Sequence, residues 1–223
     1  MRNTLALAII VLVVGCNSGN SKDAESLYMR GQSLEQQPAA SPQQARQNYE
    51  QARDAYNQAL QTNPPAPLAA KLHAGLGNAS YWLDDYSNAR EQWLAAYPST
   101  DDPATKSFML YRIGLCEQRM GNFEQADQTF AKVQQEYPNT DAAARAREHQ
   151  GFKGFTVQLA TFANSTTADS AIATLRRQGV NPAKSVNRQG NAVVSVGPVP
   201  NYRQAVDLKN RFAPTYPQAV ILP

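Results

Sequence analysis

The stretch at residues 121–138 reads GNFEQADQTFAKVQQEYP and contains a pattern that recurs along the middle of the chain. In this stretch a small residue is followed four positions later by an aromatic one. Three such pairs occur with a period of 37 residues: Ala52 with Tyr56, Ala89 with Trp93, and Ala126 with Phe130. Positions i and i+4 share one face of an α-helix, so the alanine lets a neighbouring helix approach and the ring fills the gap beside it. The period therefore predicts three stacked helical units, with these six residues in the core.

The third unit, residues 107–140, resembles the tetratricopeptide (TPR) repeat. The resemblance rests on Ile113-Gly114, Gly121-Asn122-Phe123, Ala126, Phe130 and Tyr137-Pro138. Residues 70–103 match less completely, because Asp84 stands at the position of the turn glycine, and the first unit has only its second helix in register. The resemblance implies a groove that binds a protein partner, as yet unidentified.

Helix-start signals agree with a helical array. Ser41-Pro42-Gln43-Gln44 places an N-cap residue before a proline and a glutamine, and Asp102-Pro103 repeats the cap and the proline. We expect helices near residues 23–35, 42–61, 67–83, 86–97, 103–120, 123–136 and 140–149. We expect Cys116 to be a small buried residue. We expect His73 and His149 to be surface or satisfied histidines rather than ligands, because neither has an acidic or cysteine partner in its motif.

From Gly154 onward the pattern changes from a helical period to alternation. Residues 155–160 alternate like a strand, and a helix follows behind a cap at Ser165 or Thr166. A weak strand at residues 182–186 and a strong one at 191–196 come next, the latter ended by Gly197-Pro198. Asn201 then caps a second helix, and residues 220–222 form a last strand. The order βαββαβ predicts a ferredoxin-like domain with both helices on one face of an antiparallel sheet. The fold class is therefore α+β, an all-α array followed by this domain.

The terminal segment resembles the SPOR domain, a module that binds peptidoglycan at bacterial division sites. The residues that carry the match are Thr156–Phe162, Gly179–Ala183 and Val193–Val199. The resemblance implies recognition of glycan strands stripped of their stem peptides. The family's first-strand glutamine and the hydroxyl three residues later fall on Gln158 and Thr161.

On the third strand, positions that are often arginine or aromatic in the family fall on Val193 and Asn191. Arg188 or Lys184 could replace the missing guanidinium. Alternation alone places Gln158 and Ser195 on the face opposite their apolar neighbours, where amide and hydroxyl groups can bond to sugar hydroxyls. The predicted glycan-binding residues are therefore Gln158, Thr161, Arg188, Asn191, Val193 and Ser195.

The two predicted domains differ in the sign of their net charge. Residues 151–223 hold eight Lys/Arg and two Asp/Glu, a net charge of +6, whereas residues 17–150 have a net charge of −4. A basic module would attract the lactyl carboxylate of stripped muramic acid. A basic ferredoxin-like sheet also describes RNA-recognition domains, but an exported protein would not meet nucleic acid.

Catalytic and metal chemistry find no support in the sequence. A glycan hydrolase needs two carboxylates across one sugar, and the acids of the terminal domain, Asp169 and Asp207, lie on helices predicted to cover the other face. No nucleophile elbow, P-loop or metal motif occurs, and two histidines cannot make a Cys/His zinc site. We expect no enzyme activity, cofactor or metal.

The amino terminus has the features of an export signal. Met1-Arg2-Asn3 precedes an apolar run from Leu5 to Val14, which is too short to span a bilayer as an ordinary helix. Residues 13–16, Val-Val-Gly-Cys, resemble a bacterial lipobox, which implies a lipid anchor on Cys16. Asn17 at the next position implies the periplasmic face of the outer membrane.

The expected organisation is a signal peptide at 1–15, a lipidated tether at 16–22, a TPR-like domain at 23–150 and a SPOR domain at 151–223. The leading hypothesis is a non-enzymatic lipoprotein that binds stripped glycan, at division sites, through the last domain and a partner protein through the array. The alternative is a scaffold for envelope assembly whose terminal domain has lost glycan binding.

Overall fold

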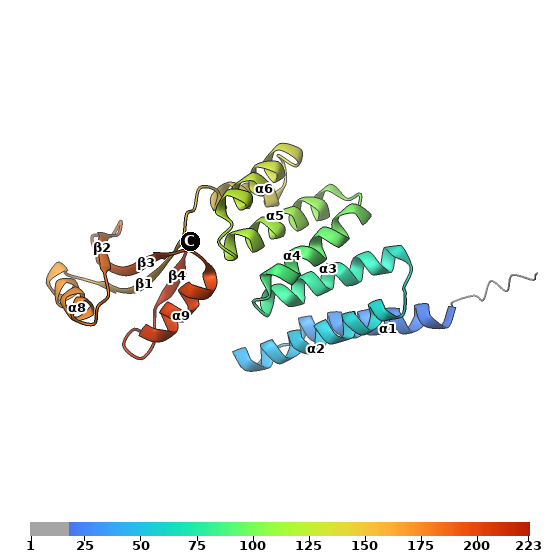
Figure 1. Cartoon of the computed structure of the whole chain (residues 1–223), viewed down its shortest axis with the longest axis horizontal. Coiled ribbons are helices and arrows are strands. Elements are labelled where there is room, and N and C mark those ends of the chain that lie inside the picture. The colour runs from blue at the N-terminus through green and yellow to red at the C-terminus, as the bar shows by residue number, and fades with distance from the viewer. Residues whose placement is uncertain (1–17) are drawn as a thin grey trace, which may run out of the picture.

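The computed structural model describes residues 18–223 and contains an array of helices followed by a domain built on a β-sheet (Figure 1). We call residues 18–149 the helical array and residues 151–223 the sheet domain. The array consists of α1 (Ser18–Gln36), α2 (Pro42–Gln61), α3 (Ala66–Trp82), α4 (Tyr86–Ala96), a short 3₁₀ turn (Tyr97–Ser99), α5 (Pro103–Arg119), α6 (Phe123–Glu136) and α7 (Asp141–His149). Within residues 18–223, no helix has both the length and the apolar character needed to cross a membrane.

The predicted helices of the array all form, and their ends agree to within one residue except at the start of α1. This helix begins at Ser18 rather than at residue 23, so residues 18–22 of the predicted tether are helical. Extending an existing helix costs far less free energy than nucleating one, which explains why a polar segment continues it. The predicted caps also form, because Ser41 Oγ accepts from the Gln44 N–H (3.1 Å) and Asp102 Oδ2 from the Thr105 N–H (2.8 Å).

The core of the array contains the alanines and aromatic residues of the 37-residue period. Phe130 and Tyr56 are fully buried, and Trp93 is 2% exposed. The rings of Trp93 and Phe130 each pack on a glycine of the preceding helix, where a Cβ would come within 2.7 Å of Trp93 at Gly77 and within 2.6 Å of Phe130 at Gly114. The small residues of the repeat therefore set how closely its helices approach. Cys116 is buried as predicted.

The turn between the two helices of a unit requires a left-handed backbone. Gly121 has φ 89° at this turn, and Asp84 has φ 63° at the equivalent place 37 residues earlier. Aspartate tolerates this conformation better than most residues. The second unit therefore keeps the turn although it lacks the glycine.

The sheet domain has the predicted βαββαβ order. Its elements are β1 (Phe155–Phe162), α8 (Ser165–Arg177), β2 (Pro182–Val186), β3 (Ala192–Val199), α9 (Tyr202–Phe212) and β4 (Val220–Leu222). The strands form one antiparallel sheet in the order β2-β3-β1-β4. Buried residues of α8, α9 and alternate positions of the strands share one core, so both helices cover the same face. The other face is open.

Three local predictions in this domain are wrong. The cap of α8 is Asn164, whose Oδ1 accepts from the Thr167 N–H (2.9 Å), rather than Ser165 or Thr166. Asn191 precedes β3 instead of opening it. The third strand also continues past Gly197-Pro198 to Val199, which pairs with Phe155. The continuation depends on glycine, because a Cβ at position 197 would lie 2.8 Å from the Phe155 carbonyl oxygen.

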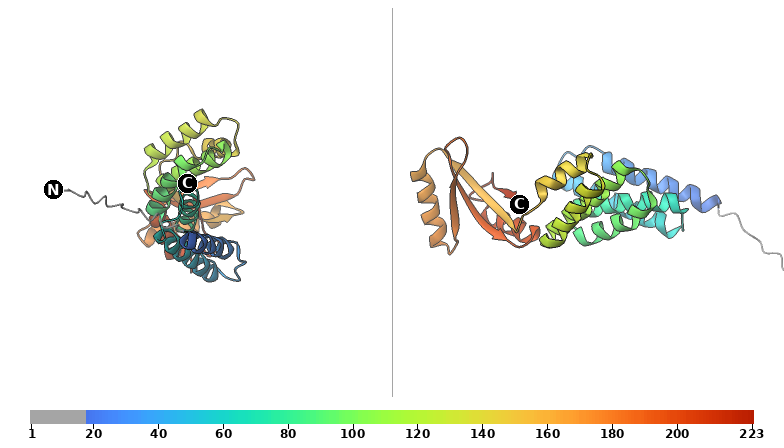
Figure 2. Two further views of the ribbon diagram at one scale, coloured as in Figure 1. Left: turned by 90° about the vertical axis from the view of Figure 1, so that its right-hand side faces the viewer. Right: turned by 90° about the horizontal axis from the view of Figure 1, so that it is seen from above.

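The array and the sheet domain lie end to end, which gives an elongated molecule (Figure 2). Aromatic contacts join them. The Arg119 guanidinium lies 3.5 Å from the centroid of the Tyr202 ring, and the rings of Phe123 and Phe155 are 5.8 Å apart. The C-terminus lies at this junction (Figure 1).

Candidate functional site

The open face of the sheet carries the predicted glycan-binding residues of the strands. Gln158, in the middle of β1, lies directly opposite Ser195 on β3. Both are partly exposed, whereas their neighbours Val157, Leu159, Val194 and Val196 are buried beneath the helices. The alternation of a strand therefore directs the amide and the hydroxyl away from the core.

Thr161 reaches the same face because β1 contains a bulge. In a regular strand, residues three positions apart point to opposite faces, which would separate Thr161 from Gln158. The pairing shifts between Gln158, opposite Ser195, and Ala160, opposite Val194, so β1 contains one residue more than its partner. Thr161 consequently pairs with Val193, and its Oγ1 accepts a hydrogen bond from Gln158 Nε2 (3.3 Å).

The open face is a polar strip between apolar residues. By register it consists of Thr156, Gln158 and Thr161 on β1, Val193 and Ser195 on β3, Ala183 and Ser185 on β2, and Val220 and Leu222 on β4. Val220 and Leu222 are 44% and 42% exposed. Sugars have hydroxyl edges and apolar C–H faces, so a strip of hydroxyl and amide groups beside valine and leucine can contact both.

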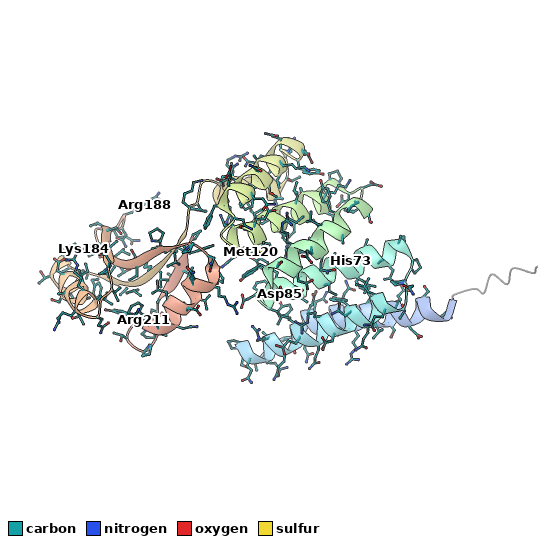
Figure 3. The ribbon with its side chains drawn as sticks, in the orientation of Figure 1. His73, Asp85, Met120, Lys184, Arg188 and Arg211 are labelled. Carbon is teal, nitrogen blue, oxygen red and sulfur yellow. The ribbon has the colours of Figure 1, made fainter. Side chains whose placement is uncertain are left out.

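The hairpin between β2 and β3 places the remaining two predicted residues at the end of the sheet. Arg188 is exposed at the tip of this hairpin (Figure 3). Asn191 stabilises the turn, since its backbone N–H donates to Asn187 Oδ1 (2.9 Å) and its carbonyl accepts from the Asn187 N–H (2.9 Å). The structure therefore gathers Gln158, Thr161, Val193 and Ser195, whereas Arg188 and Asn191 lie at the periphery.

Lys184 does not serve the open face. Its Nζ lies 2.5 Å from Asp169 Oδ1 and donates to Ser165 Oγ (2.8 Å), both on α8. This contact holds the pKa of the Asp169 carboxyl below its usual range. By register Lys184 is opposite Val194, a core residue, and the period of two therefore turns it toward the helices.

Most of the positive charge also lies on the helical side. Six of the eight basic residues of the sheet domain lie on α8 or α9 or, for Lys184, pair with α8. Arg176, Arg177, Lys209 and Arg211 occupy the last turns of these helices, where cations stabilise the helix dipole. The basic charge of the domain therefore lies mostly on the side of the sheet opposite the open face.

Sequence reasoning missed part of the open face. Thr156 lies two residues before Gln158 on the same strand, so alternation could have found it. Val220 and Leu222 lie opposite Gln158 and Thr156 in β4, and only the pairing of strands distant in sequence reveals them. Cys16, the predicted lipid attachment site, lies outside the described residues.

A second concave site lies in the helical array. A cavity of about 780 Å³ opens between α1, α3 and α5, with Trp93 of α4 at its wall. Arg112 and Asn78 line it, and Arg112 Nη1 donates to Asn78 Oδ1 (2.6 Å). The histidines lie elsewhere and are bonded to side-chain amides, His73 to Gln92 (2.7 Å) and His149 to Gln118 (3.1 Å).

Comparison with protein-family models finds a match in both the helical array and the sheet domain. The SPOR domain model matches residues 151–223, the whole sheet domain. The tetratricopeptide repeat model matches residues 25–66 and 109–140, which leaves out the unit in which Asp84 replaces the turn glycine. No curated protein matches the chain. Both are binding domains rather than catalytic ones: SPOR domains imply peptidoglycan binding and tetratricopeptide repeats imply protein–protein interaction. The chain therefore contains tetratricopeptide repeats followed by a C-terminal SPOR domain.

Proposed function

We propose that this chain is an outer-membrane lipoprotein that binds stripped glycan strands of peptidoglycan at division sites, and that its array binds a partner protein. The observation that carries the glycan proposal is the grouping of Gln158, Thr161 and Ser195 on the open face. Three side chains that can donate and accept hydrogen bonds there match a ligand made of hydroxyl groups. Removing one such partner costs about 1 to 3 kcal/mol, or roughly tenfold to a hundredfold in affinity.

The test is co-sedimentation of residues 17–223 with purified sacculi before and after amidase treatment. Gln158→Ala should strongly weaken binding to the treated sacculi while the circular dichroism spectrum stays unchanged. The matched control is Gln204→Ala, because Gln204 is an exposed glutamine on α9, which covers the other face. If Gln158→Ala binds as well as the wild type, the open face is not the glycan site.

A second candidate is a scaffold whose SPOR domain has lost glycan binding, and one observation favours it. Val193 stands at the centre of the open face where the family often has arginine, and Lys184 is held by Asp169 instead of compensating. Val193→Arg should tighten binding of stripped sacculi if the domain still recognises glycan. If the wild-type chain does not bind stripped glycan at low salt, the scaffold is the function that remains supported.

Anchoring and location rest on the lipobox-like Val-Val-Gly-Cys at residues 13–16 and on Asn17. Two or three acyl chains would hold the protein on a membrane almost permanently. Cys16→Ala should leave uncleaved precursor or release a soluble species, measured by membrane fractionation and by metabolic labelling with a fatty acid. Unchanged processing and membrane attachment in this variant would exclude lipidation at Cys16.

A further inference from the structure

The cavity of the helical array contains a guanidinium, that of Arg112, which forms no salt bridge within residues 18–223. Arg112 is partly buried, yet no carboxylate of residues 18–223 lies within 4 Å of it. Its planar group lies over Trp93, 5.3 Å from that ring's centroid, and over Phe108, at 5.0 Å. One hydrogen bond to Asn78 holds it in place. The group is therefore oriented while several of its five donors stay available.

Arg90 on the neighbouring helix α4 shows the usual arrangement for comparison. The Arg90 side chain is 29% exposed, and its Nε lies 2.8 Å from Oε1 of Glu117, whose side chain is 1% exposed. Thr129 Oγ1 donates to the other oxygen of Glu117. The array thus pairs one partly buried arginine directly with its own acid. It leaves the other, in the cavity, outside any salt bridge of residues 18–223, with Glu35 acting on it only at longer range.

The same cavity is lined by two further buried polar groups, the Tyr56 hydroxyl and the Glu35 carboxyl. The hydroxyl of Tyr56, a residue with no exposed surface, and Glu35 Oε1 are buried without a hydrogen bond of good geometry among residues 18–223. Burial raises the pKa of the Glu35 carboxyl, with Asn78, Tyr56 and Arg112 acting in the opposite direction. Glu35 and Arg112 thus influence each other across the cavity without direct contact between their charged groups.

The size of the cavity and the residues that line it indicate which kind of ligand it can accept. A cavity of about 780 Å³ lies within the range of roughly 300 to 1,000 Å³ that is usual for ligand pockets, so it can take a few side chains of a bound segment. Phe108, one helical turn from Arg112, is 38% exposed beside it, so an apolar side chain can cover this ring while an acid reaches the guanidinium. Exposed Lys71 lies at the same cavity and adds a second positive charge.

We propose that the array binds a partner protein through a segment in which an acidic side chain pairs with Arg112 and an adjacent apolar side chain packs on Phe108. The inference rests on the proposed function of the array as a protein-binding module and specifies the chemistry of its partner. The acid would form a charge-assisted hydrogen bond with the donors of Arg112 that remain available.

The test is selection of random 12-residue peptides displayed on phage against immobilised residues 17–223. The wild type should enrich peptides with Asp or Glu at one fixed position beside an apolar residue. For the selected peptide, exchange of that acid for its amide should weaken binding in calorimetry by about tenfold to a hundredfold. Arg112→Gln should remove this discrimination, so that the variant binds the acid and the amide form of the peptide equally.

Controls separate the groove from the fold and from the glycan site. Arg147→Gln removes an exposed arginine of α7 outside the cavity and should keep the discrimination. Phe108→Ser, on an already exposed side chain, should weaken the selected peptide and tests the groove even if Arg112→Gln proves unstable. Gln158→Ala should select the same peptides, so a failure of glycan binding and a failure of this inference are distinguishable. An absence of acidic enrichment, a discrimination that survives Arg112→Gln, or occupation of the groove by soluble muropeptides instead would overturn the proposal.

Discussion

His149 lies where the helical array meets the sheet domain. It ends α7, bonds to Gln118, and lies within ring contact of Phe130 and Phe152. Burial lowers its pKa from the usual 6.5, and the positive charge of Arg119 lowers it further. The folded protein therefore favours the neutral ring.

This shift predicts a pH dependence of stability. Between the lowered pKa in the folded state and 6.5 in the unfolded state, the unfolded chain binds more protons, so the free energy of unfolding falls as the pH drops through that window. Urea unfolding at pH 7.5, 6.5 and 5.5 should show this loss of stability. His149→Gln should reduce the slope of the free energy of unfolding against pH. His73→Gln is the matched control for the removal of a histidine. A slope that His149→Gln does not alter would assign the effect to other groups.

At the scale of the element, glycines determine how closely two helices of the array can pack. Gly114 of α5 faces the ring of Phe130 of α6, and a Cβ there would lie 2.6 Å from the ring. Both residues recur 37 positions from an equivalent pair, Gly77 and Trp93. The repeat thus depends on a matched small and large residue rather than on either alone.

We expect Gly114→Ala to destabilise the protein in spite of the better helix propensity of alanine. The propensity gain is about 1 kcal/mol, whereas forcing a methyl group into a packed interface costs about 1 to 3 kcal/mol. The measurement is the free energy of unfolding in a double-mutant cycle with Phe130→Leu. The smaller side chain should reduce the cost of the added methyl, and additive effects would show that the two residues do not meet.

At the scale of the whole molecule, aromatic and backbone contacts join the helical array to the sheet domain. Arg119 at the end of α5 stacks on Tyr202 at the start of α9, and the Tyr202 ring also meets Tyr86 and Phe155. A Cβ at Gly121 would lie 2.4 Å from the Pro200 carbonyl oxygen, so the two backbones touch closely there. Asp127 fixes the connecting segment by accepting from the Gly151 N–H (2.8 Å).

We predict that the array and the sheet domain tumble as one body in solution. Arg119→Ala should remove a cation–π contact worth about 0.5 to 2 kcal/mol and loosen the junction. In ¹⁵N relaxation, the wild type should give one rotational correlation time for both parts, and the variant should give two. The matched control is Arg211→Ala, because Arg211 lies over Phe212 within the sheet domain (Figure 3). Two correlation times in the wild type would mean that the junction does not hold.

Local patterns were sufficient to predict the elements and the fold class. The alanine–aromatic pairs, the caps at Ser41 and Asp102 and the alternation of each strand depend on residues within one or two turns of each other, so the sequence shows them directly. The 37-residue period and the βαββαβ order are the succession of these local patterns along the chain. The alternation that placed Gln158 and Ser195 on one face is likewise a property of each strand. The cap of α8 was misplaced by one residue because Asn164, Ser165 and Thr166 are all good caps.

Other features depend on contacts between distant segments, and only the tertiary structure decides them. A bulge arises from the pairing of β1 with β3, and it brings Thr161 beside Gln158. The pairing of β2 with β3 turns Lys184 toward Asp169 and away from the open face. Arg112 and Asn78 are 34 residues apart, and they meet only when the helices stack. Composition and periodicity specify which faces are apolar, whereas the approach of whole elements determines which polar side chains share a site.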